Sequence, residues 1–228
     1  MGRSQLLKDI VSGKDSMENV LLRLKIILSD LDNDSIMDWV DGEFQGYNQN
    51  EDVPPYRVVK GHAIGDFLVN FTSMYTQAQV PLQNLIKQEE IDKITTLHLK
   101  DGISTIQNIL SGENKNNYGV VIPTAYCHAI SLDTLQLTSM RVTIPYNMLN
   151  GIVSCVKSKL VEVIMELEKQ FDNLDDLDIK SQIEEDPSKK EEVSYNLQQI
   201  IFDSSINVGD KNKIAKSRLG NMFGGQKA

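Results

Sequence analysis

The amino-acid sequence predicts an α+β protein. Three observations lead to this class: apolar residues recur at helical spacing through the first 45 residues, strand-forming residues gather in 58–69, 118–122 and 135–144, and one apolar stripe fills 145–171. We expect an N-terminal three-helix module and a small, mostly antiparallel sheet with a long C-terminal helix packed on it. An acidic linker and a β-arch-like tail are expected to follow.

Residues 1–55 are expected to form the helical module. Its three apolar stripes cover residues 6–11, 20–31 and 36–44. Ser16 is a candidate N-cap for the second helix, because its side chain can accept a hydrogen bond from a free backbone N–H. Gly46 can end the third helix in a left-handed conformation, and the two prolines that follow at 54 and 55 prevent its continuation.

Residues 56–171 are expected to form an α+β body, in one compact unit with the helical module. Helical periodicity occupies residues 83–110 between the strand-like runs, with a break at Gly102. The last strand-like run, 135–144, alternates apolar and polar residues, so one face of the sheet is expected to meet solvent. Pro145 fits the first turn of the long helix, where its missing N–H is not needed.

The remaining residues are expected to leave this unit. Residues 172–195 are acidic and poor in apolar side chains, which predicts a solvated linker. Residues 196–228 are net basic and rich in glycine. Their alternation around a Gly-Asp-Lys-Asn turn fits a hairpin capping the domain or a β-arch adding to another chain, and the position beyond a linker favours the arch. Its candidate interaction residues are Ile206, Val208, Gly209, Asp210, Asn212 and Ile214.

Composition limits the classes of function. The chain has 228 residues and a formal net charge of −9, which argues against general affinity for nucleic acid or an anionic membrane surface. Its apolar runs are shorter than the roughly 18 to 20 residues that span a bilayer. Cys127 and Cys155 lie far apart, with no CxxC pair or disulfide framework. We therefore expect a cytoplasmic protein.

Motifs for catalysis are scarce in the sequence. His62, His98 and His128 form no HExxH or HxH pair, and neither a phosphate-binding loop nor a dinucleotide motif is present. The sequence therefore predicts no metal and no cofactor, and it favours a protein that is not an enzyme. Asp38, Asp41 and Glu43 are spread around the third helix by their spacing, which predicts a solvated face rather than a cation site.

Trp39 is the single tryptophan of the chain. With Phe44, Tyr47 and Tyr56 it could form an aromatic recognition patch. Aromatic residues at such spacing more often fix a helix to its own core, so the core role is preferred.

Two stretches of the chain resemble the AbiTii family. The opening similarity lies in residues 4–10, 21–25, 38–40, 43–47 and 55–57, which include a Trp-Val-x-x-Glu-Phe-x-Gly-Tyr element and a Pro-Tyr-Arg exit. Phe44 stands where leucine is usual in that element. Residues 144–168 resemble the long closing helix of the family, with Lys-Ser-Lys at 157–159 replacing an Arg-Asn-Arg-like segment. Tails with an Ile-x-x-Gly-Asp-x-Asn-x-Ile element also follow that helix in similar proteins.

The resemblance implies bacterial origin and a role in abortive infection or related anti-phage defence. It implies no established reaction and no catalytic residues. Six residues of the similar stretches could build one polar-aromatic corner, in which Arg57 pairs with Glu43. They are Arg23, Trp39, Glu43, Tyr47, Tyr56 and Arg57.

The leading hypothesis is a non-catalytic adaptor or sensor that acts through protein–protein binding or self-assembly. Its partner would be a second copy in a tail-mediated homo-oligomer, an effector or a phage protein. Two alternatives stay open. One is a toxin-like enzyme, such as a metal-dependent nuclease, with its site assembled from distant residues. The other is an immunity partner whose acidic linker masks a basic surface.

Overall fold

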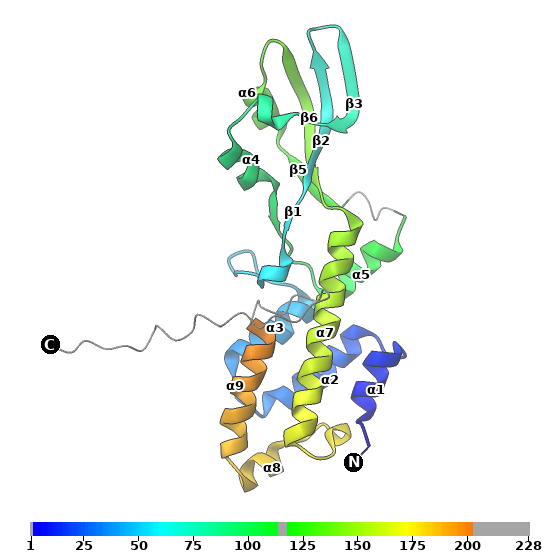
Figure 1. Ribbon diagram of the computed structural model, residues 1–228, viewed down its shortest axis with the longest axis vertical. Coiled ribbons are helices and arrows are strands. Elements are labelled where there is room, and N and C mark those ends of the chain that lie inside the picture. The colour runs from blue at the N-terminus through cyan, green and yellow to red at the C-terminus, as the bar shows by residue number, and fades with distance from the viewer. Residues whose placement is uncertain (1, 114–117, 203–228) are drawn as a thin grey trace, which may run out of the picture.

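Helical spacing in the first 45 residues produces three short helices, α1 (Gln5–Ser12), α2 (Met17–Ser29) and α3 (Asp34–Gln45). The computed structural model describes residues 2–113 and 118–202 (Figure 1). Ser4, Ser16 and Asn33 cap the three helices, each accepting a hydrogen bond from the N–H three residues later. The predicted cap at Ser16 is confirmed. The three-helix module therefore begins and ends where local sequence signals place it.

The long helix α7 (Tyr146–Gln170) is the centre of a helical body (Figure 1). α1, α5 (Ile103–Ser111) and α9 (Ser188–Phe202) pack against it, and α2 and α3 complete the body. One buried apolar cluster joins these helices. None of the helices in the described ranges has the length and hydropathy needed to cross a bilayer.

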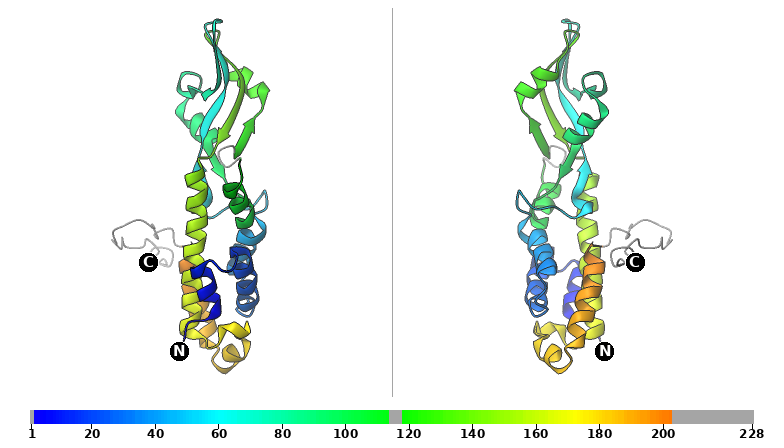
Figure 2. Two further views of the ribbon diagram at one scale, coloured as in Figure 1. Left: turned by 90° about the vertical axis from the view of Figure 1, so that its right-hand side faces the viewer. Right: turned by 90° about the vertical axis from the view of Figure 1, so that its left-hand side faces the viewer.

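A four-stranded antiparallel sheet projects from this body, and Figure 2 shows the same elongated division from two further sides. Its strands lie in the order β3 (Ser73–Gln79), β2 (His62–Val69), β6 (Leu135–Thr143) and β5 (Gly119–Ile122). The turn η2 (Leu82–Asn84), α4 (Gln88–Thr95) and α6 (Thr124–Ile130) accompany the sheet, and a second apolar cluster fills the space between them. We call this part the sheet lobe.

A short two-stranded ladder connects the sheet lobe to the helical body. It pairs β1 (Val58–Lys60) with β4 (Thr96–His98) in antiparallel register. The predicted α+β class, antiparallel pairing and strand-like runs at 118–122 and 135–144 are thus confirmed. The side chains of β3 are largely exposed, so its sequence does not alternate apolar and polar residues. For this reason the sequence did not predict β3.

The packing of the long helix differs from the prediction. The buried apolar side chains of α7 lie in the cluster of the helical body, and none lies in the cluster of the sheet lobe. Only Ile144 and Pro145 separate β6 from α7, so the chain continues away from the sheet instead of folding back across it (Figure 1). The expectation of a helix packed on the sheet is therefore wrong.

The expectation of a solvated linker over 172–195 is also wrong. These residues form η3 (Leu174–Asp176), α8 (Lys180–Glu185) and the first half of α9. Val193, Leu197 and Ile201 recur every four residues and form a buried stripe against α7. Because acidic residues are frequent in this part of the chain, its few apolar positions did not indicate a helix in the sequence.

The predicted tail begins later than residue 196, because α9 continues to Phe202. Its candidate interaction residues lie outside the described part of the chain. They are Ile206, Val208, Gly209, Asp210, Asn212 and Ile214.

Candidate functional site

The polar-aromatic corner lies where the helical body meets the sheet lobe. α3 supplies Trp39 and Glu43, and the short helix η1 (Pro55–Arg57) supplies Tyr56 and Arg57. Between them the chain turns at Gly46, whose φ of +101° is a conformation that favours glycine. The Tyr47 N–H then donates to the Lys100 carbonyl, which holds the end of α3 against the exit of β4.

A buried ion pair forms the centre of the corner. Glu43 and Arg57 are both 0% exposed. The Nη2 of Arg57 donates to Oε2 of Glu43 at 2.5 Å, and Nε donates to Oε1 at 2.9 Å. This bidentate geometry confirms the predicted pairing. The third nitrogen, Nη1, donates to the carbonyl oxygens of Leu99 and Asp101 at 3.1 and 2.7 Å.

Two tyrosines complete the hydrogen bonding of Glu43, and a tryptophan supports one of them. The hydroxyls of Tyr47 and Tyr56 donate to its Oε1 at 2.8 and 2.6 Å, and Nε1 of Trp39 donates to the Tyr56 hydroxyl at 2.8 Å. Trp39 is buried in the apolar cluster of the helical body, so the core role preferred from the sequence is confirmed. We call these five residues the clamp: Trp39, Glu43, Tyr47, Tyr56 and Arg57.

The two tyrosines and the arginine of the clamp each keep one protonation state over a wide pH range. Burial, together with the negative charge of Glu43, raises the pKa of Tyr47 and of Tyr56 far above the ordinary value. Burial acts to lower the pKa of Arg57, but the bonds and charge of Glu43 outweigh it and raise that pKa. Both oxygens of Glu43 and every guanidinium nitrogen of Arg57 have partners. The arrangement therefore ties α3, η1 and residues 99–101 together.

Arg23 does not join this network. Its guanidinium pairs instead with Asp9 at 3.0 Å and Asp15 at 3.8 Å, which ties α2 to α1 and the turn between them. The physical reason is helical phase, since Arg23 lies on the side of α2 that meets α1.

Lys159 of α7 is a neighbour of the clamp that the sequence did not predict. Its Nζ lies 5.8 Å from the centroid of the Tyr56 ring and donates to the Ile200 carbonyl at 2.6 Å. It therefore connects the clamp to the end of α9. The sequence signal that could have indicated this residue is its position in the Lys-Ser-Lys segment, which resembles a segment of the AbiTii family.

An acidic groove of about 680 Å³ lies beside the clamp. Trp39 and Tyr47 contribute to its wall together with the loop after α3 and with Phe202 at the end of α9. The lining residues include four carboxylates and no lysine or arginine. The carboxylates belong to Asp38, Asp41, Glu51 and Asp52. The predicted solvated face of α3 holds for the exposed Asp38 but not for the buried Glu43.

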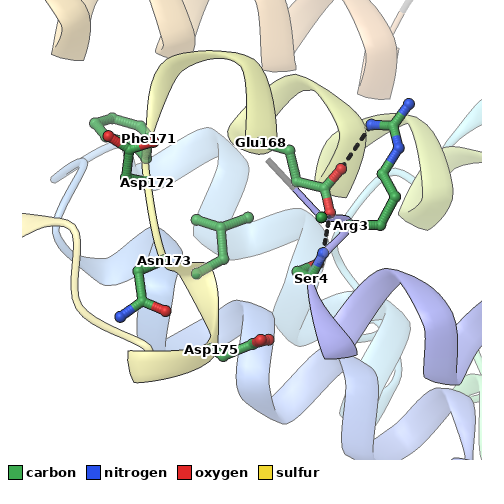
Figure 3. Close-up of a pocket in the computed structure, with 9 residues that line it drawn as sticks. Arg3, Ser4, Glu168, Phe171, Asp172, Asn173 and Asp175 are labelled. Atoms are coloured by element: carbon green, nitrogen blue, oxygen red, sulfur yellow. Dashed lines mark hydrogen bonds and ion pairs between the residues drawn. The ribbon is translucent and has the colours of Figure 1, made fainter.

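A second hollow, of about 570 Å³, lies between the N-terminal segment and the end of α7 (Figure 3). Glu168 accepts hydrogen bonds there from Nη1 of Arg3 and the N–H of Ser4, both at 2.7 Å. Burial opposes ionisation of Glu168, but these bonds outweigh it and lower its pKa. Asp175 accepts the N–H of Gln5 at 2.8 Å. The polar groups of this hollow thus anchor the start of α1.

Within residues 2–113 and 118–202, no group of three or more His, Cys, Asp or Glu side chains is placed to hold a metal ion. Both cysteines of the chain are free thiols, and burial raises the pKa of Cys127 and of Cys155.

Comparison with protein-family models matches residues 4–192 to the AbiTii model. The match includes the sheet lobe and extends beyond α7 into α9, in agreement with the folded state of 174–202. Comparison with curated proteins gives no match, and comparison with solved structures gives none.

Proposed function

The chain belongs to the AbiTii family, and from this premise we propose that it is a non-catalytic adaptor or sensor of a bacterial abortive-infection system. Family membership implies the role in anti-phage defence. The adaptor role, its action through protein–protein binding and its place in the cytoplasm are the proposal. The partner is a second copy, an effector or a phage protein.

The exposed edge strand β5 is the observation that carries the proposal. β5 pairs with β6 on one side and has no described strand on its other side. Val120 is 49% exposed and Val121 is 77% exposed. An apolar edge strand presents free backbone groups for pairing with another chain, and natural proteins commonly block such edges when they have no partner.

The opposite edge of the sheet is blocked in this way. The pairing of β3 with β2 shifts register between Gly65 and Phe67. Gln77 has a φ of +50°, and its N–H donates to the Asp66 carboxylate at 2.8 Å instead of continuing the ladder. Such a bulge bends an edge strand away from further pairing. The contrast favours β5 as the strand that receives a partner.

The clamp supports this role by position. Arg57 precedes β1, and its carbonyl acceptors at residues 99 and 101 follow β4, so the clamp holds both strands of the connecting ladder to α3. We assign the family element around Trp39 and Arg57 to fixing the sheet lobe on the helical body. Clamp residues then affect partner binding through the lobe and the acidic groove they support.

A phage-challenge assay tests the proposal. Cells expressing Val121→Lys should be lysed like cells without the protein, because a lysine on β5 opposes docking of an apolar strand. Val11→Lys is the matched control: the same substitution at a 61% exposed position on α1 should leave protection unchanged. Both purified variants should unfold at the wild-type temperature. Full protection by Val121→Lys would refute the role of β5.

Light scattering then identifies the class of partner. Loss of an oligomer in Val121→Lys would indicate a second copy, whereas an unchanged mass with lost protection would indicate a different protein. A chain ending at Phe202 tests the contribution of residues 206–214 to self-assembly without cutting α9. Magnesium-dependent cleavage of nucleic acid by the purified wild type would reject the non-catalytic role in favour of a toxin-like enzyme.

A further inference from the structure

The acidic groove combines a carboxylate rim with an apolar wall. Lys25 pairs with Asp41, and the Glu51 carboxylate accepts the N–H and side-chain amide of Asn48. Asp38 and Asp52 are exposed on the rim. The apolar surface comes mainly from Tyr47, residues 53–55 and Phe202, and the nearly buried Trp39 borders the groove from the core. A groove of this kind fits a segment that carries both basic and apolar side chains.

The chain itself contains such a segment immediately after the described residues. Residues 203–228 carry five basic side chains and two acidic ones, although the whole chain has a net charge of −9. The basic residues are Lys211, Lys213, Lys216, Arg218 and Lys227, and the large apolar residues among them are Ile214, Leu219, Met222 and Phe223. Charge and apolar character therefore both complement the groove.

The end of α9, which this segment follows in the sequence, lies at the groove. Phe202 lines the groove and is 46% exposed. The Ile200 carbonyl accepts Lys159 of α7, and the side-chain amide of Gln198 donates to Ser35 of α3 at 2.9 Å. These bonds fix the end of α9, so that Phe202 lies at the groove. Docking within one chain then has an effective concentration on the order of millimolar, which a separate chain does not reach at low concentration.

We propose that the acidic groove between α3, residues 46–55 and the end of α9 binds the chain's own C-terminal segment, residues 203–228. A segment held in this groove is withheld from other chains, so docking opposes assembly through residues 206–214. The contact responds to salt, because exposed ion pairs are screened. The inference stands on the charge and position of the groove and does not depend on the role of β5.

Zero-length carbodiimide cross-linking of the full-length chain tests the proposal, since it joins lysines to carboxylates in direct contact. Equal amounts of ¹⁴N- and ¹⁵N-labelled protein are mixed, and cross-linked peptides are identified by mass spectrometry. We expect links from lysines 211–227 to Asp38, Glu51 or Asp52, with both peptides carrying the same isotope. Links of mixed isotope would overturn docking within one chain and indicate a second copy.

Charge variants provide the controls. Asp38→Asn/Asp52→Asn should lower the yield of tail cross-links to Glu51, one of the two groove carboxylates that remain, about fivefold, and Glu89→Gln/Asp133→Asn on the sheet lobe should leave it unchanged. If the groove variant does not fold, Lys213→Glu/Lys216→Glu/Arg218→Glu tests the same contact without altering any described residue, and its yield is measured only for links from Lys211 and Lys227, which both proteins retain. An unchanged yield at Glu51 in either variant would overturn the proposal.

Trp39 supplies a second readout, because it lines the groove and is the only tryptophan in the chain. Its fluorescence should change when salt is raised to about 1 M, because the Debye length then falls to roughly 3 Å and the ion pairs between tail and groove are screened. The tail variant should remove this change. An equal salt response in the wild type and in the tail variant would contradict occupancy of the groove by the tail.

Discussion

Replacement of Glu43 by glutamine should lower the unfolding temperature of the protein substantially while leaving the shape of the side chain almost unchanged. The wild-type carboxylate accepts two hydrogen bonds from Arg57 and one from each of two tyrosine hydroxyls. The amide of glutamine can still accept some of these bonds. Its nitrogen, however, is a donor, and it cannot neutralise the guanidinium beside it.

The size of the effect follows from burial of the pair. Both side chains are 0% exposed, so the variant leaves the positive charge of Arg57 in the interior without a countercharge. Removing one partner of a buried pair costs about 3–5 kcal/mol of folding free energy. Since each kcal/mol shifts the midpoint by about 2–4 °C for a chain of this size, the unfolding temperature should fall by roughly 6–20 °C.

Thermal and urea unfolding followed by circular dichroism would measure this change. Asp92→Asn is the matched control, because it removes one partner of an exposed ion pair. The side chain of Asp92 is 46% exposed and that of its partner Lys60 is 59% exposed. Exposed pairs of this kind contribute little to stability, because water and salt screen the two charges. Asp92→Asn should therefore unfold within a few degrees of the wild type.

A double-mutant cycle with Arg57→Met separates pairing from general damage. In Glu43→Gln/Arg57→Met neither charge remains in the interior, so the combined loss should be smaller than the sum of the single losses by about 2–3 kcal/mol. Additive losses, or a loss below about 1 kcal/mol in Glu43→Gln, would refute the clamp as the element that holds the junction together.

Substitutions at four other positions have defined outcomes. Trp39→Phe should lower the free energy of unfolding in urea by about 1 kcal/mol, because the hydrogen bond to Tyr56 is lost. Trp39→Ala should lower it by about 3–5 kcal/mol and unfold the helical module. A folded Trp39→Ala variant that lacks only partner binding would instead mark an interaction site. Gly46→Ala should lower the free energy of unfolding by more than about 2 kcal/mol, because the new Cβ would lie 2.6 Å from the Lys100 carbonyl oxygen and the residue has a positive φ. Gly151→Ala is the control: its Cβ would meet nothing within 4 Å, so the substitution should be neutral or stabilising. Glu168 has a lowered pKa in the folded state, so its contribution to stability is present above its ordinary pKa of 4.5 and is lost as pH falls through the folded value; Glu168→Gln should therefore be less stable than the wild type at pH 7, and an equal difference in acid would contradict this origin.

Local signals in the sequence predicted much of the secondary structure. Ser16 caps α2, Gly46 ends α3 at a positive φ, and the strand runs at 118–122 and 135–144 became β5 and β6. Each signal is contained in a few neighbouring residues, so it does not depend on tertiary contacts with the rest of the chain. The pairing of Glu43 with Arg57 was predictable because each buried charge needs a partner of opposite sign.

The sequence by itself therefore determined the α+β class, the approximate ends of the first three helices and of α7, and the charge pair. The tertiary structure decided that α7 belongs to the helical body, that residues 174–202 fold onto it, that Arg23 lies apart from the clamp, and that Lys159 joins α7 to α9. It also brought four carboxylates from α3 and the following loop to the end of α9. These outcomes depend on which faces of distant elements meet, and a local pattern specifies that a face is apolar or charged without specifying what covers it.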